Sequence, residues 1–538
     1  MGSRALCRLF LVPFLVGLTT SWANAQAFRV QCPTTTSMHP AAGTGSPTGL
    51  PYTGPTTFTD PITGLNYTSN GGQVKCQQVS GGDGYATMAD GSQIYMFAFG
   101  PLSGLSNIAE GQPGTVTQDV FNQVYNGNLQ VGDPATTDNG NSAVDLASFT
   151  YNGAVGLAPD LDASTGNGAP GPIDGHVDPR PIMDVGVMNG NQPAPLMAID
   201  EDDEFFLTLS NVGMLMRPDL FEQHTIHFHG YPNASAFYDG VPDASVAINI
   251  GGSMSYYYLA PDAGTYFWHC HITPPEHLQM GMVGQLYVRP RQNRVPIGKD
   301  LFASLQLQQT DLRTAANCAN DVLCTTPQPI ADTGFMQAVD PLTGSPYKYA
   351  YNDGDGSTRY DVEYPLQLMG FDPNFHFVGM TFNPEDFAGM KDKYFLLNGR
   401  SYPDTVQAGP METPSSDGVK HFSQPLPSII NIPSGGRALL RISDLDVTEF
   451  QTVASLGIPM QVIAYNARLL RDQAGVNLYY NTNSITLGGG ESLDVILDAS
   501  DTTKYPSGSV FYLYTPNLDH LANDAENFGG LMTEVHIN

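Results

Sequence analysis

The chain has 538 residues, 41% of them hydrophobic, so it is long enough for two or more domains with sizeable cores. It carries 52 acidic and 22 basic residues, a formal net charge of −30. Such a surface repels the phosphate backbone, so no nucleic acid partner is expected. After the first residues no stretch approaches roughly 20 consecutive apolar residues, and no membrane span is expected.

The first 25 residues are predicted to be a secretory signal peptide. Arg4 and Arg8 precede the apolar run LFLVPFLVGL, and the small residues ANA at 23–25 are typical of a cleavage site. The mature chain is therefore predicted to begin at Gln26. It is expected to be exported to the periplasm or the extracellular space.

Five cysteines remain after the signal peptide, in a compartment that permits disulfides. Cys318 and Cys324 flank a five-residue loop and are predicted to close it. Cys32 and Cys76 bracket a Gly-, Pro- and Thr-rich arm and are predicted to join it to the first domain. Cys270, flanked by histidines, is left over, which favours a metal thiolate.

The regular segments are short strands bounded by Gly, Pro, Asn or Asp, and long helical patterns are scarce. Strands at this spacing are typical of Greek-key sandwiches. In the first half of the chain, strands are predicted at 93–99, 204–210, 255–260, 265–271 and 284–290. In the second half of the chain, further strands are predicted within 394–402, 428–445, 459–467, 491–499 and 509–516.

Two all-β sandwich domains are therefore predicted. The composition divides the chain into a signal peptide (1–25), an N-terminal arm (26–80), a first domain with a long irregular insertion (81–290), a linker (291–365) and a second domain (366–538). The end of the second domain resembles the end of the first in its order of aromatic strand, histidine-containing loop and Gly-rich turn. We interpret this as an internal repeat whose second copy has lost most metal-binding residues.

Half of the 12 histidines lie in two short stretches, HTIHFHG at 224–230 and FWHCHITPPEHLQMGMVG at 267–284. A thiolate, imidazoles and a thioether together suit copper better than magnesium or calcium. Two His, one Cys and a distant Met are the ligands of a blue-copper electron-transfer site. Zinc is the alternative metal, but a structural zinc site prefers several thiolates, and only one Cys is present.

Alternation along a strand separates the ligands into two groups. His227 and His229 share one face, as do His269 and His271, whereas Cys270 points to the opposite face. A metal held by Cys270 would therefore be joined through the backbone to a second metal centre on the far side. The sequence thus predicts a short path for electrons between two centres.

These motifs resemble the copper-binding motifs of the multicopper oxidases, the laccase and metallo-oxidase family. The likeness is specific over residues 219–290 and general elsewhere. It implies copper as the cofactor and two cupredoxin-like domains. By the family pattern, the type-1 copper ligands are His224, Cys270, His277 and Met282, and the type-2 and type-3 ligands are His227, His229, His269 and His271. Catalysis is expected to depend on Cys270 and these last four histidines.

The chain departs from this pattern in two ways. The loop between Cys270 and His277 is two residues longer than usual, and Met280 is a second, less well spaced candidate for the axial ligand. The family uses eight histidines in four HxH pairs for its trinuclear cluster, and this chain has two such pairs. The other histidines form none: His39, His176, His376, His421, His520 and His536.

Three arrangements would complete the second centre. Two copies of the first domain can meet about a two-fold axis, a different subunit can supply the missing pairs, or the centre can hold a single type-2 copper. The last resembles the copper nitrite reductases, in which another chain adds a histidine. His520 is the candidate for that histidine, but its position in the loop NLDHLAND favours an ordinary surface-loop histidine.

Three carboxylates near the motifs are less informative. Asp239 and Asp262 occur in turn contexts, and turn formation accounts for them. Glu276 beside His277 has two functional interpretations: orienting that ligand or receiving a reducing metal ion. Plain solvent exposure explains it as well.

The sequence therefore predicts an exported multicopper oxidase that takes single electrons at a type-1 copper. It reduces dioxygen to water at a type-2/type-3 centre completed by another chain, in a homo-oligomer or with a partner copper subunit. The reducing substrate is expected to be a metal ion or a small molecule. The alternatives are a nitrite-reductase-like enzyme and a type-1 electron carrier or structural assembly subunit.

Overall fold

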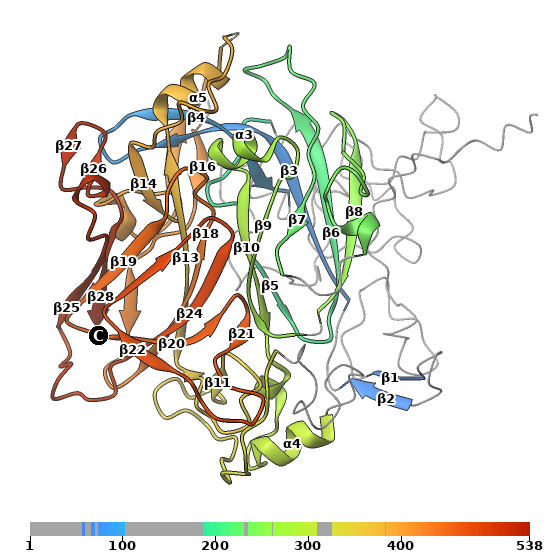
Figure 1. Cartoon of the computed structure of the whole chain (residues 1–538), viewed down its shortest axis with the longest axis vertical. Coiled ribbons are helices and arrows are strands. Elements are labelled where there is room, and N and C mark those ends of the chain that lie inside the picture. Colours follow the sequence, from blue (N-terminus) through green and yellow to red (C-terminus); the bar gives the residue numbers. More distant parts are fainter. Residues whose placement is uncertain are drawn as a thin grey trace, which may run out of the picture.

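The computed structural model of the chain describes 56–59, 66–69, 74–102, 187–230, 235–260, 262–308, 325–381, 383–416, 418 and 420–538. The described residues form two β-sandwiches side by side (Figure 1). The first is coloured blue and green in that view, and the second orange to red. An all-β fold is thus confirmed. No helix among the described residues is long and apolar enough to cross a membrane.

Two four-stranded sheets make the first sandwich. One has the order β4-β3-β6-β8, with strands β3 Val74–Thr87, β4 Gln93–Pro101, β6 Glu204–Gly213 and β8 Ser253–Leu259. The other has the order β5-β10-β9-β7, with strands β5 Met197–Asp200, β7 His227–Phe228, β9 Gly264–His269 and β10 Val283–Arg289. Strands β6 and β9 are buried along their whole length, so both faces of each strand are covered by other parts of the chain.

A larger and a smaller sheet make the second sandwich. The larger has the order β21-β20-β24-β18-β13-β14-β26-β27, with β22 on β20: β13 Val362–Phe371, β14 Tyr394–Leu397, β18 Arg437–Asp444, β20 Met460–Tyr465, β21 Arg468–Leu469, β22 Tyr480–Thr482, β24 Glu491–Asp498, β26 Ala522–Asn523 and β27 Glu526–Asn527. The smaller has the order β17-β28-β25-β19-β23: β17 Ile430–Ile432, β19 Gln451–Leu456, β23 Ser484–Leu487, β25 Val510–Tyr514 and β28 Met532–Ile537.

The remaining elements are short. The strands are β1 Thr56–Thr59, β2 Asn66–Ser69, β11 Lys348–Tyr349, β12 Arg359–Tyr360, β15 Met411–Pro414 and β16 Lys420–Gln424. The helices are α3 Pro274–Gln279, α4 Leu301–Gln308 and α5 Pro373–Gly379, with 3-10 turns η1 Ala236–Tyr238, η2 Arg291–Arg294, η4 Asp404–Val406 and η5 Leu518–His520.

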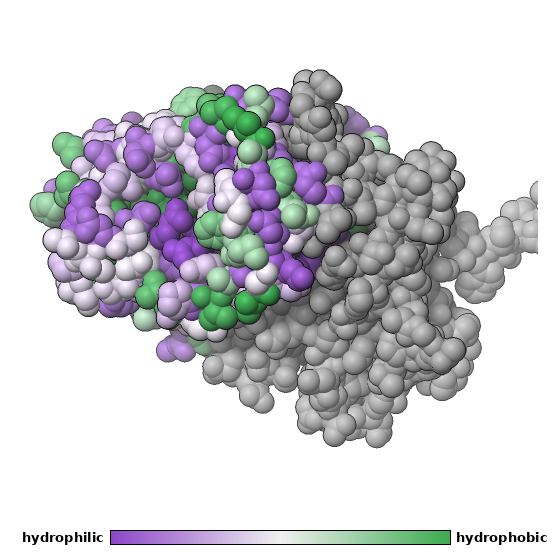
Figure 2. Space-filling model, turned by 90° about the horizontal axis from the view of Figure 1, so that it is seen from below, coloured by the Kyte–Doolittle hydropathy of each residue, from purple (hydrophilic) through white to green (hydrophobic). Residues whose placement is uncertain are grey.

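On the face shown in Figure 2, hydrophilic residues alternate with separate hydrophobic groups.

Two strands extend beyond the predicted domain limits. β3 begins at Val74, inside the segment predicted to be an N-terminal arm, because it pairs in parallel with β6 from Val74 onward. β13 begins at Val362, inside the predicted linker, where it pairs in parallel with β18. The signal peptide and most of the insertion lie outside the described residues, so the domain ranges stay a prediction.

Buried polar contacts join the two sandwiches along β9 and β10. Thr265 Oγ1 donates to Asp494 Oδ1 at 2.5 Å, and Arg441 Nη1 donates to Thr265 Oγ1 at 3.1 Å. Gln285 Nε2 donates to Ser443 Oγ at 2.6 Å. Because these groups are removed from water, each depends on its partner across the interface. The strand that ends at His269 is therefore fixed to the second sandwich as well as to its own sheet.

Candidate metal centre

A buried ligand set lies where β9 ends. The side chains of His224, Cys270 and His277 are fully buried, and one ligand atom from each lies within 4.8 Å of the others. Cys270 Sγ is 3.2 Å from His277 Nδ1 and 3.9 Å from His224 Nδ1. Both rings thus direct Nδ1 at the sulfur.

Backbone hydrogen bonds bring Met282 to the same set. Met282 N donates to His277 O at 2.8 Å, and Cys270 N donates to Met282 O at 3.1 Å. The sulfur of Met280 instead packs against Gly379 of α5 in the second sandwich. The loop that appeared elongated in the sequence is folded as helix α3, with Pro274 and Pro275 in its first turn.

Thr225, just before β7, and Gly81 of β3 line this set. Thr225 N lies 3.5 Å from Cys270 Sγ, so its N–H stabilises negative charge on the sulfur. Thr225 Oγ1 accepts from His271 N at 3.0 Å, so one residue contacts both sides of the Cys270 segment. Gly81 of β3 leaves room for the His224 ring, because a Cβ there would lie 2.7 Å from Cδ2.

The electrostatics of the buried set favour a thiolate. Burial alone would raise the pKa of Cys270, but the charges and hydrogen bonds of His277 and His224 outweigh it and lower the pKa to about 5. Burial lowers the pKa of His224. For His277 burial acts in the same direction, but the Cys270 thiolate outweighs it and raises the pKa to about 10. A thiolate and two imidazoles are a donor set that fits copper.

A second set lies on the other side of Cys270. His227, His229 and His269 have ligand atoms within 4.8 Å of one another, and the Nε2 atoms of His229 and His269 are 2.8 Å apart. The His271 ring centroid lies 5.0 Å from that of His227 and 5.6 Å from that of His269. All except His269 are partly exposed. The structure therefore gathers all four histidines, although the group of ligand atoms within 4.8 Å does not include His271.

Backbone carbonyls select which ring nitrogen is free. His227 Nδ1 donates to Asp239 O, and His269 Nδ1 donates to Cys270 O, each at 2.6 Å. Because these bonds hold the proton on Nδ1, both rings present an unprotonated Nε2, as a metal ligand requires. Burial lowers the pKa of His229 to about 4 and that of His269 to about 3, which also favours neutral imidazoles.

Asp239 is one residue whose role the sequence did not reveal. It was assigned to a turn alone, but its carbonyl fixes His227. Gly240 allows this arrangement: its φ is +83°, and a Cβ there would lie 2.0 Å from Ile226 O. The adjacent Asp-Gly pair near the motif was the available signal. Asp262 is buried, at 7% exposure.

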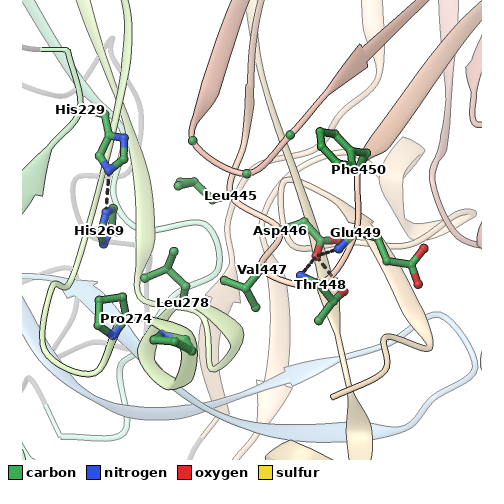
Figure 3. A pocket seen from close by; sticks show the side chains of 14 residues that line it. His229, His269, Pro274, Leu278, Leu445, Asp446, Val447, Thr448, Glu449 and Phe450 are labelled. Carbon is green, nitrogen blue, oxygen red and sulfur yellow. Dashed lines mark hydrogen bonds between the residues drawn. The ribbon is translucent and has the colours of Figure 1, made fainter. Parts of the chain in front are cut away.

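A cavity of about 450 Å³ opens beside the second set, between the two sandwiches. Figure 3 shows His229 and His269 on one wall and the loop from Leu445 to Phe450 on the other. Pro274, Pro275, Leu278 and the glycines at 488–490 complete the lining. The loop that faces the histidines carries Asp446 and Glu449 but no histidine.

The interpretation of His520 as a surface-loop histidine is wrong, because the residue is 3% exposed. Its ring stacks on Phe395, with centroids 3.7 Å apart. Nδ1 lies 3.1 Å from Gln451 Oε1 and Nε2 lies 2.9 Å from Glu449 Oε2. Both ring nitrogens therefore face groups of the second sandwich rather than the second ligand set.

Carboxylates border the buried set at His277. Glu222 Oε2 lies 3.4 Å from His277 Nε2. Glu276 is only 7% exposed, so its interpretation as a solvent-exposed residue is wrong. Burial and then the neighbouring Glu385 and Glu222 raise the pKa of Glu276 to about 8, against the opposite effect of His277. Glu222 was not identified from the sequence, although it precedes His224 by two residues.

Several predicted features fall outside the described residues, namely Cys32, Cys318, Cys324, His39 and His176. Among the described residues Cys270 is a free cysteine. His376 is buried against β4, where Nδ1 bonds to Tyr95 O. His421 lies on β16 and His536 on β28, away from both ligand sets along the chain.

Residues 175–293 match the family model described as multicopper oxidase. A laccase, abr2, of Aspergillus fumigatus is 33% identical over 177 residues, which are 32% of this chain and 26% of that protein. A copper-containing nitrite reductase of Rhizobium meliloti is 35% identical over 109 residues, 19% of this chain and 26% of that protein. The matches thus span about a quarter of these curated relatives.

Among solved structures, the blue copper oxidase from Nitrosomonas europaea is 16% identical, with 86% of this chain and 85% of that chain aligned and a TM-score of 0.45. The multicopper oxidase mgLAC is 15% identical, with 86% of each chain aligned and a TM-score of 0.44.

Proposed function

We propose, from the match of residues 175–293 to the multicopper oxidase model, that the chain is an exported copper-dependent oxidoreductase. It takes electrons singly from a reductant and gives four of them, with four protons, to one dioxygen, which becomes two waters. Copper bound by the two ligand sets supplies the one-electron chemistry. The predicted signal peptide at 1–25 supports export.

One observation carries this proposal. Cys270 belongs to the buried set, and its two chain neighbours, His269 and His271, belong to the second set. The two sets are therefore linked through two peptide units, without an intervening gap between elements. Thr225, which contacts both sides of this segment, fixes the spacing. An isolated metal site would not need ligands on both flanks of its cysteine.

We further propose that another chain completes the second set. Three of its four histidines are partly exposed, and no other histidine of the described residues shares this site. The candidate that the sequence offered in the second sandwich, His520, is bonded to Glu449 and Gln451. A second copy of this chain or a partner copper subunit would therefore have to supply the missing imidazoles.

The carboxylates at His277 support a metal ion as the reductant. Glu222 is 23% exposed at its side chain and lies against the ring nitrogen that faces away from Cys270. Glu276 and Glu385 add carboxyl groups beside it. Oxygen ligands of this kind bind divalent cations, and the net charge of −30 favours their approach.

Nitrite reduction is the second candidate, and one observation favours it. Three histidines, His227, His229 and His269, have ligand atoms that all lie within 4.8 Å of one another, and His271 is not part of that group. Three imidazoles suffice for a single type-2 metal. In that case the second centre would reduce nitrite instead of dioxygen.

Copper per chain and electron paramagnetic resonance of the intact assembly test these proposals. A type-1 signal, a type-2 signal and a spin-coupled silent pair support the oxidase. Equal type-1 and type-2 signals without silent copper support the nitrite reductase. A type-1 signal alone would show an electron carrier or assembly subunit, and the proposed oxidase activity would be wrong.

A further inference from the structure

Helix α3, which carries His277, is too short to hold its own conformation. It has six residues, Pro274–Gln279, and it begins after Thr273 in the left-handed region at φ 37°. Isolated helices of fewer than about 12 residues are marginal in water, because nucleation costs more than a single turn recovers. The position of His277 therefore depends on what packs against α3.

Gln279 connects α3 to the second sandwich. It follows His277 by two positions, and at 100° per residue the two side chains leave the helix on nearly opposite sides. His277 meets Cys270 in the first sandwich, whereas Gln279 meets the second. Gln279 is fully buried, although it bears a polar amide.

Both ends of that amide are used across the domain interface. Gln279 Nε2 donates to Asp392 Oδ1 at 2.9 Å, and Gln279 Oε1 accepts from Asp372 N at 2.8 Å. Asp372 is also the N-cap of α5, since its side chain accepts from the amides of Asn374 and Phe375. The amide of Gln279 is thus fixed by the start of a helix and by a buried carboxyl.

Helix α5 makes further contacts around the same loop. Arg217 Nη1 donates to Gly379 O at 2.6 Å, and the sulfur of Met280 packs on Gly379. The His376 ring bonds to Tyr95 O of β4. The second sandwich, which supplies no ligand among the described residues, therefore packs against the end of the element that carries one.

We propose that Gln279 is a positioning residue, through which the second sandwich fixes α3 and sets the place of His277 in the buried ligand set. The role rests on the proposed function, in which His277 binds copper. Through Gln279 the second sandwich orients a ligand of the type-1 site, although the described residues of that sandwich supply no ligand. Residues that hold metal ligands in place from outside the ligand set commonly change metal affinity 10- to 100-fold when substituted.

Gln279→Met tests the proposal, with Gln292→Met as a matched control. Gln292 is also fully buried; its Nε2 donates to Asp353 Oδ1 at 2.7 Å, and its Oε1 accepts from Gly354 N at 2.9 Å. Both substitutions therefore remove a buried amide with one carboxylate and one backbone partner. Only Gln279 lies on α3. Both purified full-length variants are compared with the unaltered chain.

The first readout is the copper-loaded protein. Gln279→Met is expected to lower Cu²⁺ affinity at the buried set by about tenfold in a chelator competition, and to shift the thiolate absorption band and the type-1 resonance. Gln292→Met should leave both spectra unchanged. Equal spectra for Gln279→Met and the unaltered chain would overturn the proposal, as would equal changes in the two variants.

The second readout needs no copper. Amide hydrogen exchange at 274–282 in the metal-free chain is expected to accelerate at least tenfold in Gln279→Met and not in Gln292→Met. If the unaltered chain shows no thiolate band, the proposed function fails, and this exchange experiment still decides whether Gln279 fixes α3. Unchanged exchange at 274–282 would contradict the proposal independently of any metal.

Discussion

Cys270 and His277 form a buried pair in which the sulfur lies 3.2 Å from Nδ1. With the pKa of Cys270 lowered to about 5 and that of His277 raised to about 10, the metal-free pair is a thiolate and an imidazolium at neutral pH. Metal binding must displace the proton of His277, so copper uptake releases a proton. The thiolate itself is already formed, which removes one step from metal capture.

Replacing this sulfur separates the two ligand sets experimentally. Cys270→Ser is expected to abolish the intense thiolate absorption and to lower copper by one ion per chain, because a serine hydroxyl is not a soft ligand. The second set keeps its four histidines and should retain its copper. Optical spectra and metal analysis check both results. Persistence of the intense band would show that another residue binds the type-1 copper.

The turn after Asp239 is expected to be essential for the second set. Gly240→Ala places a Cβ 2.0 Å from Ile226 O at φ +83°, so the turn must shift and Asp239 O must leave His227. The positive φ alone costs roughly 1–2 kcal/mol. Copper at the second set and the midpoint of urea unfolding should both fall.

Gly251→Ala is the control for that turn. Gly251 also has a positive φ, 77°, but nothing lies within 4 Å of its ideal Cβ. Gly251→Ala should lower the midpoint of urea unfolding through its backbone conformation alone, and it should keep the copper of the second set. If the two variants bound copper equally, the contact between Asp239 and His227 would not matter for the site.

The carboxylate nearest His277 should discriminate between reductants. Glu222→Gln is expected to raise KM for a divalent metal ion about tenfold, roughly 1.4 kcal/mol, and to leave KM for a neutral phenol unchanged. Glu412→Gln, at an exposed pair with Lys420, is the control. Steady-state kinetics with both reductants decide the point. Equal effects on the two would indicate damage to His277 instead of loss of a cation site.

Asp392 gives the fold a pH dependence whose sign is opposite to that of an ordinary salt-bridged carboxylate. Burial, followed by the charge of Asp446, raises its pKa from 3.8 to about 8. Between these values the folded chain holds a proton that the unfolded chain has lost, so stability falls as pH rises from about 4 to about 8 and is level above.

Asp392→Asn should flatten this dependence. The difference in free energy of unfolding between this variant and the unaltered chain should shift in favour of the variant from pH 5 to pH 8, by on the order of a few kcal/mol. Asp243→Asn, at an exposed position, is the control and should leave the curve unchanged. Urea unfolding at a series of pH values measures both. A parallel pair of curves for Asp392→Asn and the unaltered chain would contradict the raised pKa.

The motifs and the strands were accessible from sequence because their signals are local. The runs at 93–99 and 204–210 lie in β4 and β6, and most of the run at 265–271 lies in β9, which ends at His269. Alternating or continuous apolar residues bounded by turns specify strands directly. The grouping of histidines on either side of Cys270 follows from the same two-residue period.

Contacts between distant segments left no such signal. Gln279 meets Asp392 across 113 positions, and Thr265 meets Asp494 across 229. Helix α3 was missed although Pro274 and Pro275 stand where prolines favour a helix start. His520 was misplaced because a polar residue in a short loop resembles a surface residue until its stacking partner, Phe395, is known.

The unequal burial of the two ligand sets has a kinetic consequence. A copper ion that meets the folded chain can reach His227, His229 and His271 from solvent, whereas His224, Cys270 and His277 are sealed beneath β3, β8 and the α3 loop. Filling the sealed set after folding requires a transient opening of the structure, and the surface set requires none. Added copper should therefore occupy the chain in two stages, with colourless uptake before blue.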